Sequence, residues 1–379
     1  MEPSPADGAG EGKLASITHR TFARVGLFGN PSDQYHGRTI AFSLANFSAE
    51  VTLTPSSDPA DTAIHIVPHP LYDSTDYSSL DQLVTRTATE GLYGGVRLLL
   101  AACKRFGEHC KQHGIQLAPK RGFSLSYDTN VPRQTGLSGS SAIIYSALKC
   151  LADWYGLGDA QLPAAARPGL VLSVEAGELG IAAGLQDRVV QVYGGLVHMD
   201  FDPAHMAAHS GAGRYSRLDP ELLPKPLYIM YSENPSESGK VHSGVKAKWL
   251  AGDPEVRALM MRVAACGDEG LRLLLASAGD GARDRRLAEL MCANFDLRHA
   301  LFGDAVLGAR NLRMVELAKS MGAGVNFTGS GGAVVVFCKE GPAQAEALRA
   351  AAEAEGFTMV AVQVGPETAP LPSAAALGS

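Results

Sequence analysis

The chain has 379 residues, of which 46% are hydrophobic and 19% are charged, and its formal net charge is −6. This balance is typical of a globular protein and excludes disorder over most of the chain. The acidic charge and the lack of a Lys/Arg block argue against a nucleic-acid partner. No unbroken apolar run approaches the roughly 20 residues that a transmembrane helix needs, so we expect no membrane contact.

The two ends of the chain have the composition of tails. Residues 1–18 and 366–379 are rich in Gly, Pro and Ala, and we predict that both stretches are disordered. The first stretch lacks the apolar segment of a secretory signal and the Arg-rich pattern of a transit peptide. The six cysteines include no C-x-x-C pair, which indicates reduced thiols. We therefore expect a cytoplasmic protein.

The first half of the chain mixes strand-like and helix-like segments. Apolar patterns predict strands at 21–27, 39–44, 47–54, 122–129 and 196–201. Helical spacing predicts one or two helices over 80–112 and further helices at 140–155 and 162–177. The segment 55–78 is predicted to be a surface loop because Pro, Ser and Asp are frequent in it.

An aperiodic stretch, 202–226, separates the two halves, and we place a domain boundary there. It predicts an N-terminal domain over 19–205 and a C-terminal domain over 226–365. The second half has predicted strands at 227–232, 333–338 and 358–364, and predicted helices at 254–277, 283–304, 310–321 and 342–354. Because strands and helices do not alternate regularly, the predicted fold class is α+β.

The loop before the helix at 140–155 carries the clearest chemical signal. Its sequence, VPRQTGLSGSSA over 131–142, combines glycines that permit a tight turn with serines at a helix start. Free backbone N–H groups and the positive end of the helix dipole meet there and bind a polyphosphate. The alternative is that Ser140 only caps the helix. No Walker A sequence is present, and no G-x-G-x-x-G follows the first strand, which disfavours a P-loop or dinucleotide fold.

Three segments of the chain resemble the motifs of one enzyme superfamily. Residues 132–142, PRQTGLSGSSA, are similar to the second motif of the galactokinase, homoserine kinase, mevalonate kinase and phosphomevalonate kinase (GHMP) superfamily. Residues 23–30, ARVGLFGN, resemble its first motif, and residues 327–336, FTGSGGAVVV, resemble its third. Within the superfamily, the stretches 29–41, 132–142 and 181–201 look most like plant-type glucuronokinases.

The resemblance implies a fold and a nucleotide site. The expected fold has an N-terminal domain like domain 2 of ribosomal protein S5 and a ferredoxin-like C-terminal α/β sandwich, with ATP in the cleft between them. The nucleotide contacts that the motifs imply are Pro132, Arg133, Gln134, Gly136, Leu137, Ser138, Gly139, Ser140, Ser141, Gly329, Ser330 and Gly331.

The resemblance also implies catalytic roles. Asp187 corresponds to the general base that takes the proton of the sugar hydroxyl, and Arg24 would stabilise the developing charge and lower the pKa of Asp187. Glu175 with Ser141 would hold Mg²⁺. Because the motif has one additional residue, Ser140 is an alternative to Ser141, and Glu178 is the rival of Glu175.

The implied acceptor site faces the turn after the first strand. Asn30, Ser32 and Asp33, together with Asp187, are expected to bind the sugar. The carboxylate of a sugar acid also needs a cation, and the candidates are Arg133, Arg188 and Lys240.

The expected activity is transfer of phosphate from ATP to the anomeric hydroxyl of D-glucuronate, with a small-molecule sugar acid and ATP as the partners. The alternatives are a kinase for another sugar (galacturonate, galactose, arabinose or a heptose phosphate), a sugar-binding regulator without activity, and a decarboxylase of the mevalonate type. The oligomeric state does not follow from the sequence.

Overall fold

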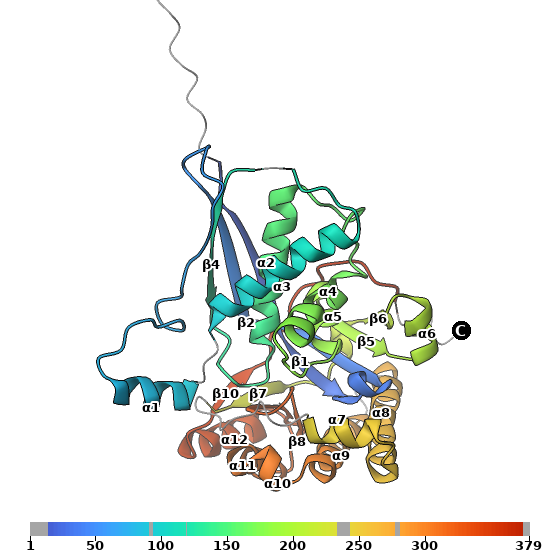
Figure 1. Cartoon of the computed structure of the whole chain (residues 1–379). Coiled ribbons are helices and arrows are strands. Elements are labelled where there is room, and N and C mark those ends of the chain that lie inside the picture. The colour runs from blue at the N-terminus through green and yellow to red at the C-terminus, as the bar shows by residue number, and fades with distance from the viewer. Residues whose placement is uncertain (1–13, 91–93, 119, 233–242, 277–280, 374–379) are drawn as a thin grey trace, which may run out of the picture.

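A computed structural model of the chain describes residues 14–90, 94–118, 120–232, 243–276 and 281–373. The candidate cation Lys240 lies outside the described residues, as do residues 1–13 of the predicted tail 1–18 and residues 374–379 of the predicted tail 366–379. The first prediction is wrong for residues 17–18, which belong to a strand. The described part contains two β-sheets with helices packed against them (Figure 1). None of its helices combines the length and the apolar character required to cross a membrane.

The first sheet has six strands and is organised around β2 (Arg38–Pro55). Antiparallel β1 runs along nearly all of β2, while the other edge of β2 pairs first with β5 and then with β4. The remaining strands extend the sheet at its two ends, which gives the order β3-β4-β2-β5-β6. The bounds are Ile17–Phe28 for β1, Ile64–Ile66 for β3, Phe123–Thr129 for β4, Leu196–Asp200 for β5 and Arg214–Leu218 for β6.

Strand β2 is continuous, although its sequence predicted two strands. The pairing with β1 shifts register between Phe22 and Ala23, opposite residues 45–47, so the apparent break is a β-bulge. The side chain of Asn46 is used there, because its amide donates to the carbonyl of Ala361 at 2.9 Å and accepts from the N–H of Gln363 at 2.8 Å.

Alternation along the central strands gives each face of the first sheet its own core. Ala41 and Val51 face a cluster with side chains of α2 (Gly95–Gln112), α3 (Gly139–Tyr155) and α5 (Gln186–Tyr193). Ile40 and Phe42 on the opposite face join the second sheet and its helices. The helix α3 is buried on most of its surface because it crosses β1 and β2 and also contacts α2.

The helix predicted at 162–177 is shorter than expected. It begins as α4 (Arg167–Leu172) and continues as a π-helical turn, η2 (Ser173–Glu178). Pro168 explains the late start, since proline is accepted in the first helical turn but not in the interior. Smaller elements of this half are η1 (Ser32–Tyr35), α1 (Leu80–Glu90), α6 (Pro203–Ala208) and η3 (Pro220–Leu222).

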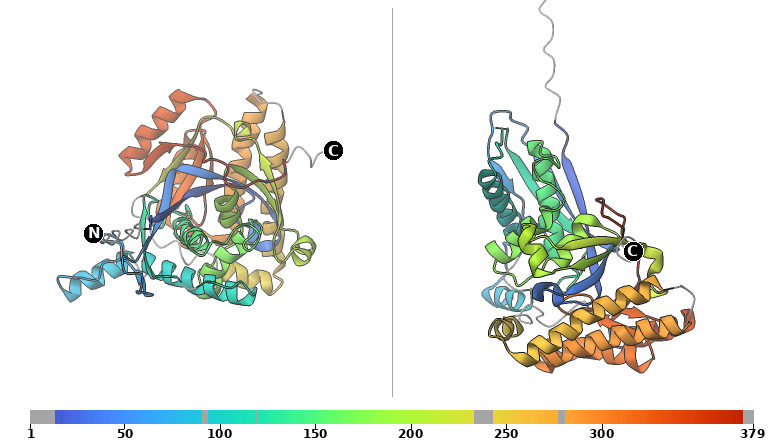
Figure 2. Two further views of the ribbon diagram at one scale, coloured as in Figure 1. Left: turned by 90° about the horizontal axis from the view of Figure 1, so that it is seen from above. Right: turned by 90° about the vertical axis from the view of Figure 1, so that its right-hand side faces the viewer.

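The second sheet has four antiparallel strands in the order β10-β7-β9-β8, which is the ferredoxin-like arrangement that the sequence predicted. Its strands are β7 (Leu227–Tyr231), β8 (Gly324–Phe327), β9 (Ala333–Phe337) and β10 (Thr358–Ala361). The helices are α7 (Ser243–Leu250), α8 (Pro254–Leu275), α9 (Gly281–Phe302), α10 (Asp304–Leu307), α11 (Ala309–Ser320) and α12 (Pro342–Ala354). The long helices α8 and α9 lie side by side (Figure 2, right).

The two halves share a core, and the chain returns to the first sheet at its end. Leu27 of β1 and Val335 of β9 belong to one buried cluster. The interpretation of 366–379 as a disordered tail is wrong for 366–373: the N–H of Thr368 donates to Tyr193, and the side chain of Arg217 donates to Ala369. The aperiodic segment 202–226 contains β6, which is part of the first sheet.

Candidate active site

A cavity of about 680 Å³ lies where the end of β1, the loop before α3, the start of α5 and the loop after β8 meet. It is lined by most of the residues that the motifs singled out, namely Arg24, Asn30, Asp33, Pro132, Arg133, Gln134, Gly136, Leu137, Ser138, Gly139, Ser140, Glu175, Asp187, Gly329 and Ser330. A volume of this size accommodates a small-molecule ligand. Residues that are about 300 positions apart in the chain therefore form one site.

The loop that precedes α3 has the backbone of an anion-binding turn. Gln134, Gly136 and Ser138 all have positive φ angles, of 57°, 63° and 65°. α3 begins at Gly139, directly after these residues. Gly139 and Ser140 line the cavity, so the free N–H groups of the first helical turn lie at the cavity wall. Ser138 makes no side-chain capping bond, so its hydroxyl is available for the site rather than for the helix.

Glycine is required where this loop meets the loop after β8. A Cβ atom on Gly136 would lie 2.6 Å from the carbonyl oxygen of Gly331, and one on Gly329 would lie 2.1 Å from the carbonyl oxygen of Gly136. The backbones of the second and third motifs thus touch. Gly331 contributes this backbone contact and is not among the lining residues, in contrast to its predicted role as a nucleotide contact.

Arg24 and Asp187 form the centre of the site. Nε of Arg24 donates to Oδ1 of Asp187 at 2.5 Å, and Nη2 donates to Oδ2 at 2.5 Å. The guanidinium is fixed because Nη1 also donates to the carbonyls of Gly136 and Thr328. The hydroxyl of Ser138 donates to Oδ2 of Asp187 at 2.6 Å, which links the loop before α3 to the carboxylate.

Two of the carboxyl groups that line the cavity, Asp187 and Asp33, have opposite pKa shifts. Burial alone would raise the pKa of Asp187, but the positive charges of Arg24 and Arg188 and the hydrogen bonds from Arg24 and Ser138 hold it well below its usual range. The pKa of Asp33 is raised to about 7, first by burial and then by the negative charge of Asp187. Two carboxyl groups with such different environments are typical of catalytic sites.

Ser140, and not Ser141, is the serine that reaches Glu175. The hydroxyl of Ser140 donates to Oε1 of Glu175 at 2.6 Å, whereas Ser141 is fully buried and donates to the carbonyl of Ser138 at 3.2 Å. Of the two serines that the sequence left open, this contact favours Ser140 as the partner of Glu175, because α3 turns the side chain of Ser141 toward the core. The rival carboxylate, Glu178, forms an ion pair with Lys104.

A hydroxyl beside a carboxylate fits a magnesium ion, which prefers oxygen ligands and keeps phosphate oxygens and water in its shell. Glu175 lies on the π-helical turn η2 and is only 1% exposed. Its Oε2 accepts from Nε of Arg188 at 2.8 Å, which leaves Oε1 beside Ser140. No group of three or more His, Cys, Asp or Glu ligands occurs in the part of the chain that the structure describes.

Of the three predicted sugar contacts in the polar turn after β1, two line the cavity and one does not. Asp33 lines the cavity, where its Oδ2 accepts from the N–H of Gln186 at 3.2 Å. The side chain of Ser32 is buried and faces the carbonyl of Arg38 at 3.2 Å, so the expectation that it contacts the sugar is not met. Asn30 lines the cavity but also ties the turn to β8, since its amide donates to the carbonyl of Phe327 at 2.9 Å.

The candidate cations for a substrate carboxylate have different surroundings. The guanidinium of Arg188 is occupied, with Glu175 on two nitrogens and with Gly184 and Asp187 on the third. Arg133 lines the cavity and lies over the ring of Tyr72, 5.6 Å from its centroid.

Three polar residues to which the sequence motifs assign no role also line the cavity. The side-chain oxygens of Gln34 and Gln186 are buried and have no hydrogen-bond partner among the described residues. Arg298, from α9, is fully buried, and two of its nitrogens also have no hydrogen-bond partner among the described residues. A signal exists in the sequence, because Asn294 and Arg298 fall on the helical stripe that also carries Met291 and Phe302.

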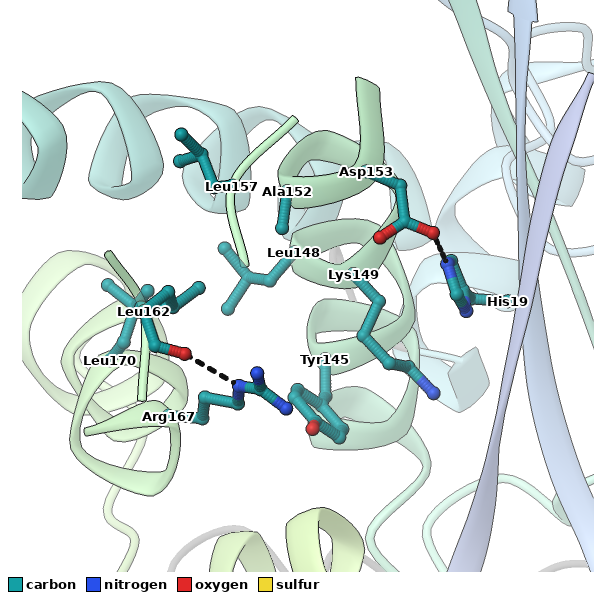
Figure 3. Close-up of a pocket in the computed structure, with 10 residues that line it drawn as sticks. All are labelled: His19, Tyr145, Leu148, Lys149, Ala152, Asp153, Leu157, Leu162, Arg167 and Leu170. Atoms are coloured by element: carbon teal, nitrogen blue, oxygen red, sulfur yellow. Dashed lines mark hydrogen bonds and ion pairs between the residues drawn. The ribbon is translucent and has the colours of Figure 1, made fainter. Parts of the chain in front are cut away.

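A second cavity, of about 170 Å³, lies beside the C-terminal half of α3 and contains none of the predicted site residues (Figure 3). Leucine side chains occupy much of its wall. His19 and Asp153 form a pair at 2.7 Å at one side, and Arg167 donates to the carbonyl of Leu162 at 3.1 Å at the other. It has neither a glycine loop nor a carboxylate pair, so we assign the chemistry to the larger cavity.

Comparisons with known proteins identify the family of the chain. The family model described as GHMP kinases N terminal domain matches residues 97–195, and the model described as GHMP kinases C terminal matches residues 274–356. The chain is 51% identical to Glucuronokinase 1 and 50% identical to Probable glucuronokinase 2, both of Arabidopsis thaliana, over 97% of this chain and 97% and 96% of theirs. The galactokinase of Lactococcus lactis, solved with galactose, superposes with a TM-score of 0.68 at 16% identity, covering 93% of this chain and 94% of its own. The chain belongs to the GHMP kinase family, together with these glucuronokinases.

Proposed function

We propose that this chain is a sugar-1-kinase that transfers the γ-phosphoryl group of ATP to the anomeric hydroxyl of D-glucuronate, giving D-glucuronate 1-phosphate and ADP. The observation that carries the proposal is the contact of Ser138, in the phosphate loop, with Asp187, which is paired with Arg24. A phosphate site and a proton acceptor therefore adjoin each other in one cavity. The half-identical full-length relatives support glucuronate as the acceptor.

The phosphate end of the site belongs to the loop before α3. The N–H groups at the first turn of α3 face the triphosphate, and the helix dipole adds to their attraction. Ser140 and Glu175 would hold a magnesium ion, which supplies charge neutralisation for the β- and γ-phosphates when it is bound. This part of the site positions the γ-phosphorus without covalent chemistry of its own.

The acceptor end belongs to Asp187 and Arg24. The Oδ2 atom of Asp187 already accepts from Arg24 and Ser138 and forms an ion pair with Arg188. The Oδ1 atom accepts from Arg24 and, at the longer distance of 3.5 Å, from the side-chain amide of Gln186. We assign Oδ1 as the acceptor of the sugar proton. The anomeric oxygen forms its bond to the γ-phosphorus, the bond from that phosphorus to ADP breaks, and the proton moves to Asp187 and then to water.

The low pKa of Asp187 is compatible with this role. Phosphoryl transfer passes through a loose transition state, so the hydroxyl needs to lose its proton only late, when its oxygen already bonds phosphorus and has become acidic. An ionised carboxylate is required to orient the hydroxyl before that point. Arg24 secures the ionised state, because its charge favours the carboxylate over the acid.

The test is a panel of sugars in an assay of ADP release, with the product identified by phosphorus NMR. We expect D-glucuronate to have the highest kcat/KM among D-glucuronate, D-galacturonate, D-galactose, L-arabinose and a heptose phosphate, with magnesium required. A higher kcat/KM for galacturonate or galactose would overturn the assignment of the substrate. Absence of magnesium-dependent ADP formation with every sugar would indicate a binding protein instead. The cytoplasmic location and the lack of a nucleic-acid partner stay predictions.

A further inference from the structure

Arg298 is a buried arginine that forms no ion pair with any residue that the structure describes. It is 0% exposed, yet it forms part of the cavity wall. Its Nη2 donates to the carbonyl of Gly329 at 2.5 Å, while Nε and Nη1 have no hydrogen-bond partner among the described residues. Burying a guanidinium in this way is costly, and in native proteins such a charge is normally paired. A missing anionic partner is the simplest explanation.

The surroundings of Arg298 place it at the acceptor end of the cavity. Its pKa is lowered to about 9, first by burial and then by the positive charge of Arg24, whereas Asp33 acts in the opposite direction. Arg24 holds the proton acceptor and Asp33 belongs to the turn after β1, so both neighbours are on the sugar side. The carbonyl that Arg298 contacts belongs to Gly329, which lies against Arg24, since a Cβ atom on Gly329 would come within 2.8 Å of Nη2 of Arg24.

The guanidinium is also held in place before any ligand arrives. It lies over the ring of Phe327, 5.3 Å from the centroid, and one turn earlier on α9 the side chain of Asn294 accepts from the N–H of Gly29 at 2.7 Å and donates to the carbonyl of Asn30 at 3.2 Å. These bonds fix α9 against the turn after β1. A preorganised charge of this kind binds a planar anion more strongly than a mobile one does.

We propose that Arg298 binds the C6 carboxylate of the sugar acid and thereby sets the preference for an acidic over a neutral sugar. The inference rests on the proposed function. The site offers matching groups, since two unpaired guanidinium nitrogens suit a carboxylate and the unpaired oxygens of Gln34 and Gln186 suit sugar hydroxyls. The other buried arginines of the site, Arg24 and Arg188, already donate to Asp187 and Glu175.

The experiment compares Arg298→Met and Arg298→Lys with the wild type, using D-glucuronate and its neutral counterpart D-glucose, the latter as a substrate or as a competitive inhibitor. We expect Arg298→Met to lower kcat/KM for glucuronate by about 10²-fold or more, because charge-assisted hydrogen bonds are lost. The KM for ATP and the binding of glucose should change less than about 3-fold. Arg298→Lys should restore part of the loss.

Arg283 is the matched control, since it is a buried arginine on the same helix whose nitrogens donate to the carbonyls of Leu273, Leu222 and Leu274. Arg283→Met should lower Tm and leave the preference for glucuronate over glucose, measured by the kinetics with the two sugars, unchanged. Arg298→Met should keep or raise Tm, because an unpaired buried charge is removed. If Arg298→Met does not fold, the preference of Arg298→Lys for glucuronate over glucose tests the proposal instead.

The outcomes separate the two proposals. A wild type that is inactive with glucuronate contradicts the proposed function, whatever the variants do. A wild type that prefers glucuronate, combined with Arg298 variants that lose both sugars equally or that raise only the KM for ATP, overturns the inference and assigns Arg298 to the phosphate. Unchanged kinetics in both Arg298 variants also overturns it.

Discussion

Arg24 and Asp187 are joined by two hydrogen bonds of 2.5 Å each, one from Nε and one from Nη2, although 163 positions separate them in the chain. The arginine comes from β1 and the aspartate from the first turn of α5. The pair fixes both the charge and the direction of the carboxylate that faces the cavity. Two of the predictions below depend directly on it.

Replacing Asp187, which we propose as the proton acceptor, should stop turnover and leave nucleotide binding intact. For Asp187→Asn we expect kcat to fall by about 10²- to 10⁴-fold, because the neutral amide neither orients the hydroxyl as a carboxylate does nor accepts its proton. The Kd for ATP, measured by calorimetry, should change little. Asp153→Asn is the control, since Asp153 lies far along α3 and pairs with His19. Full turnover of Asp187→Asn would contradict the assignment.

Removing the guanidinium should make the reaction sensitive to acid. In Arg24→Gln the burial that raises the pKa of Asp187 is less opposed, so that pKa moves upward. The wild type keeps Asp187 ionised throughout the usual assay range, and its kcat should show no acid limb from this residue. The variant should lose activity as the pH falls through the new, higher pKa. A pH profile of kcat measures the difference, and parallel profiles would argue against the role of Arg24.

Replacing each of the two serines at the start of α3 by alanine should have a different effect. Ser140→Ala should increase the magnesium concentration needed for half-maximal activity, because the hydroxyl next to Glu175 is removed. Ser141→Ala should leave that requirement unchanged and cost about 1 kcal/mol of the free energy of unfolding, since a buried hydrogen bond to Ser138 is lost. Magnesium titrations and urea unfolding of both variants decide; the reverse pattern would restore the pairing predicted from the sequence.

Asp33 should control sugar binding near neutral pH. Its pKa of about 7 lies above the ordinary value, so the folded protein binds a proton that the unfolded chain releases between about pH 4 and 7. This contribution to stability is present at low pH and is lost as the pH rises through 7. The ionised form would accept from sugar hydroxyls, so kcat/KM should rise as the pH passes through 7. Asp33→Asn should remove that rise and increase Tm more at pH 8 than at pH 5. An unchanged profile would exclude Asp33 as the titrating group.

The contact between the glycine loops should tolerate no side chain. Gly329→Ala places a Cβ 2.1 Å from the carbonyl oxygen of Gly136, so we expect a loss of about 1–3 kcal/mol in stability and weaker ATP binding. Gly107→Ala is the comparison, because Gly107 lies within α2 and a Cβ there meets nothing within 4 Å. That change should stabilise the protein by about 0.5–1 kcal/mol. Equal effects at the two positions would show that the loops do not touch in solution.

Much of the fold could be predicted from the sequence, because most elements are long and strongly patterned. β1, α3 and α12 carry clear periods, whereas β3 and β8 have three and four residues, too few to establish one. The segment after residue 202 was interpreted as irregular, yet β6 lies within it. Its sequence, RYSRL, places Arg217 where an apolar residue is usual, and only pairing with β5 makes it a strand.

The site was partly predictable for a different reason. Close approach of backbones requires glycine, so the loops near Gly136 and Gly329 are visible in the sequence. The choice between Ser140 and Ser141 depends on the rotation of α3, which a local pattern does not specify. Arg298 comes from a helix of the second half and reaches the cavity only through the packing of α9 against the turn after β1.

The segment 366–373 has a consequence for biosynthesis. Its residues hydrogen-bond with Gly195 and Arg217 at the margin of the first sheet, which is otherwise complete by residue 218. A nascent chain therefore leaves this margin of the first sheet without these hydrogen bonds until residues 366–373 have been synthesised. A chain that ended after β10 would contain every strand of both sheets and would still lack these hydrogen bonds.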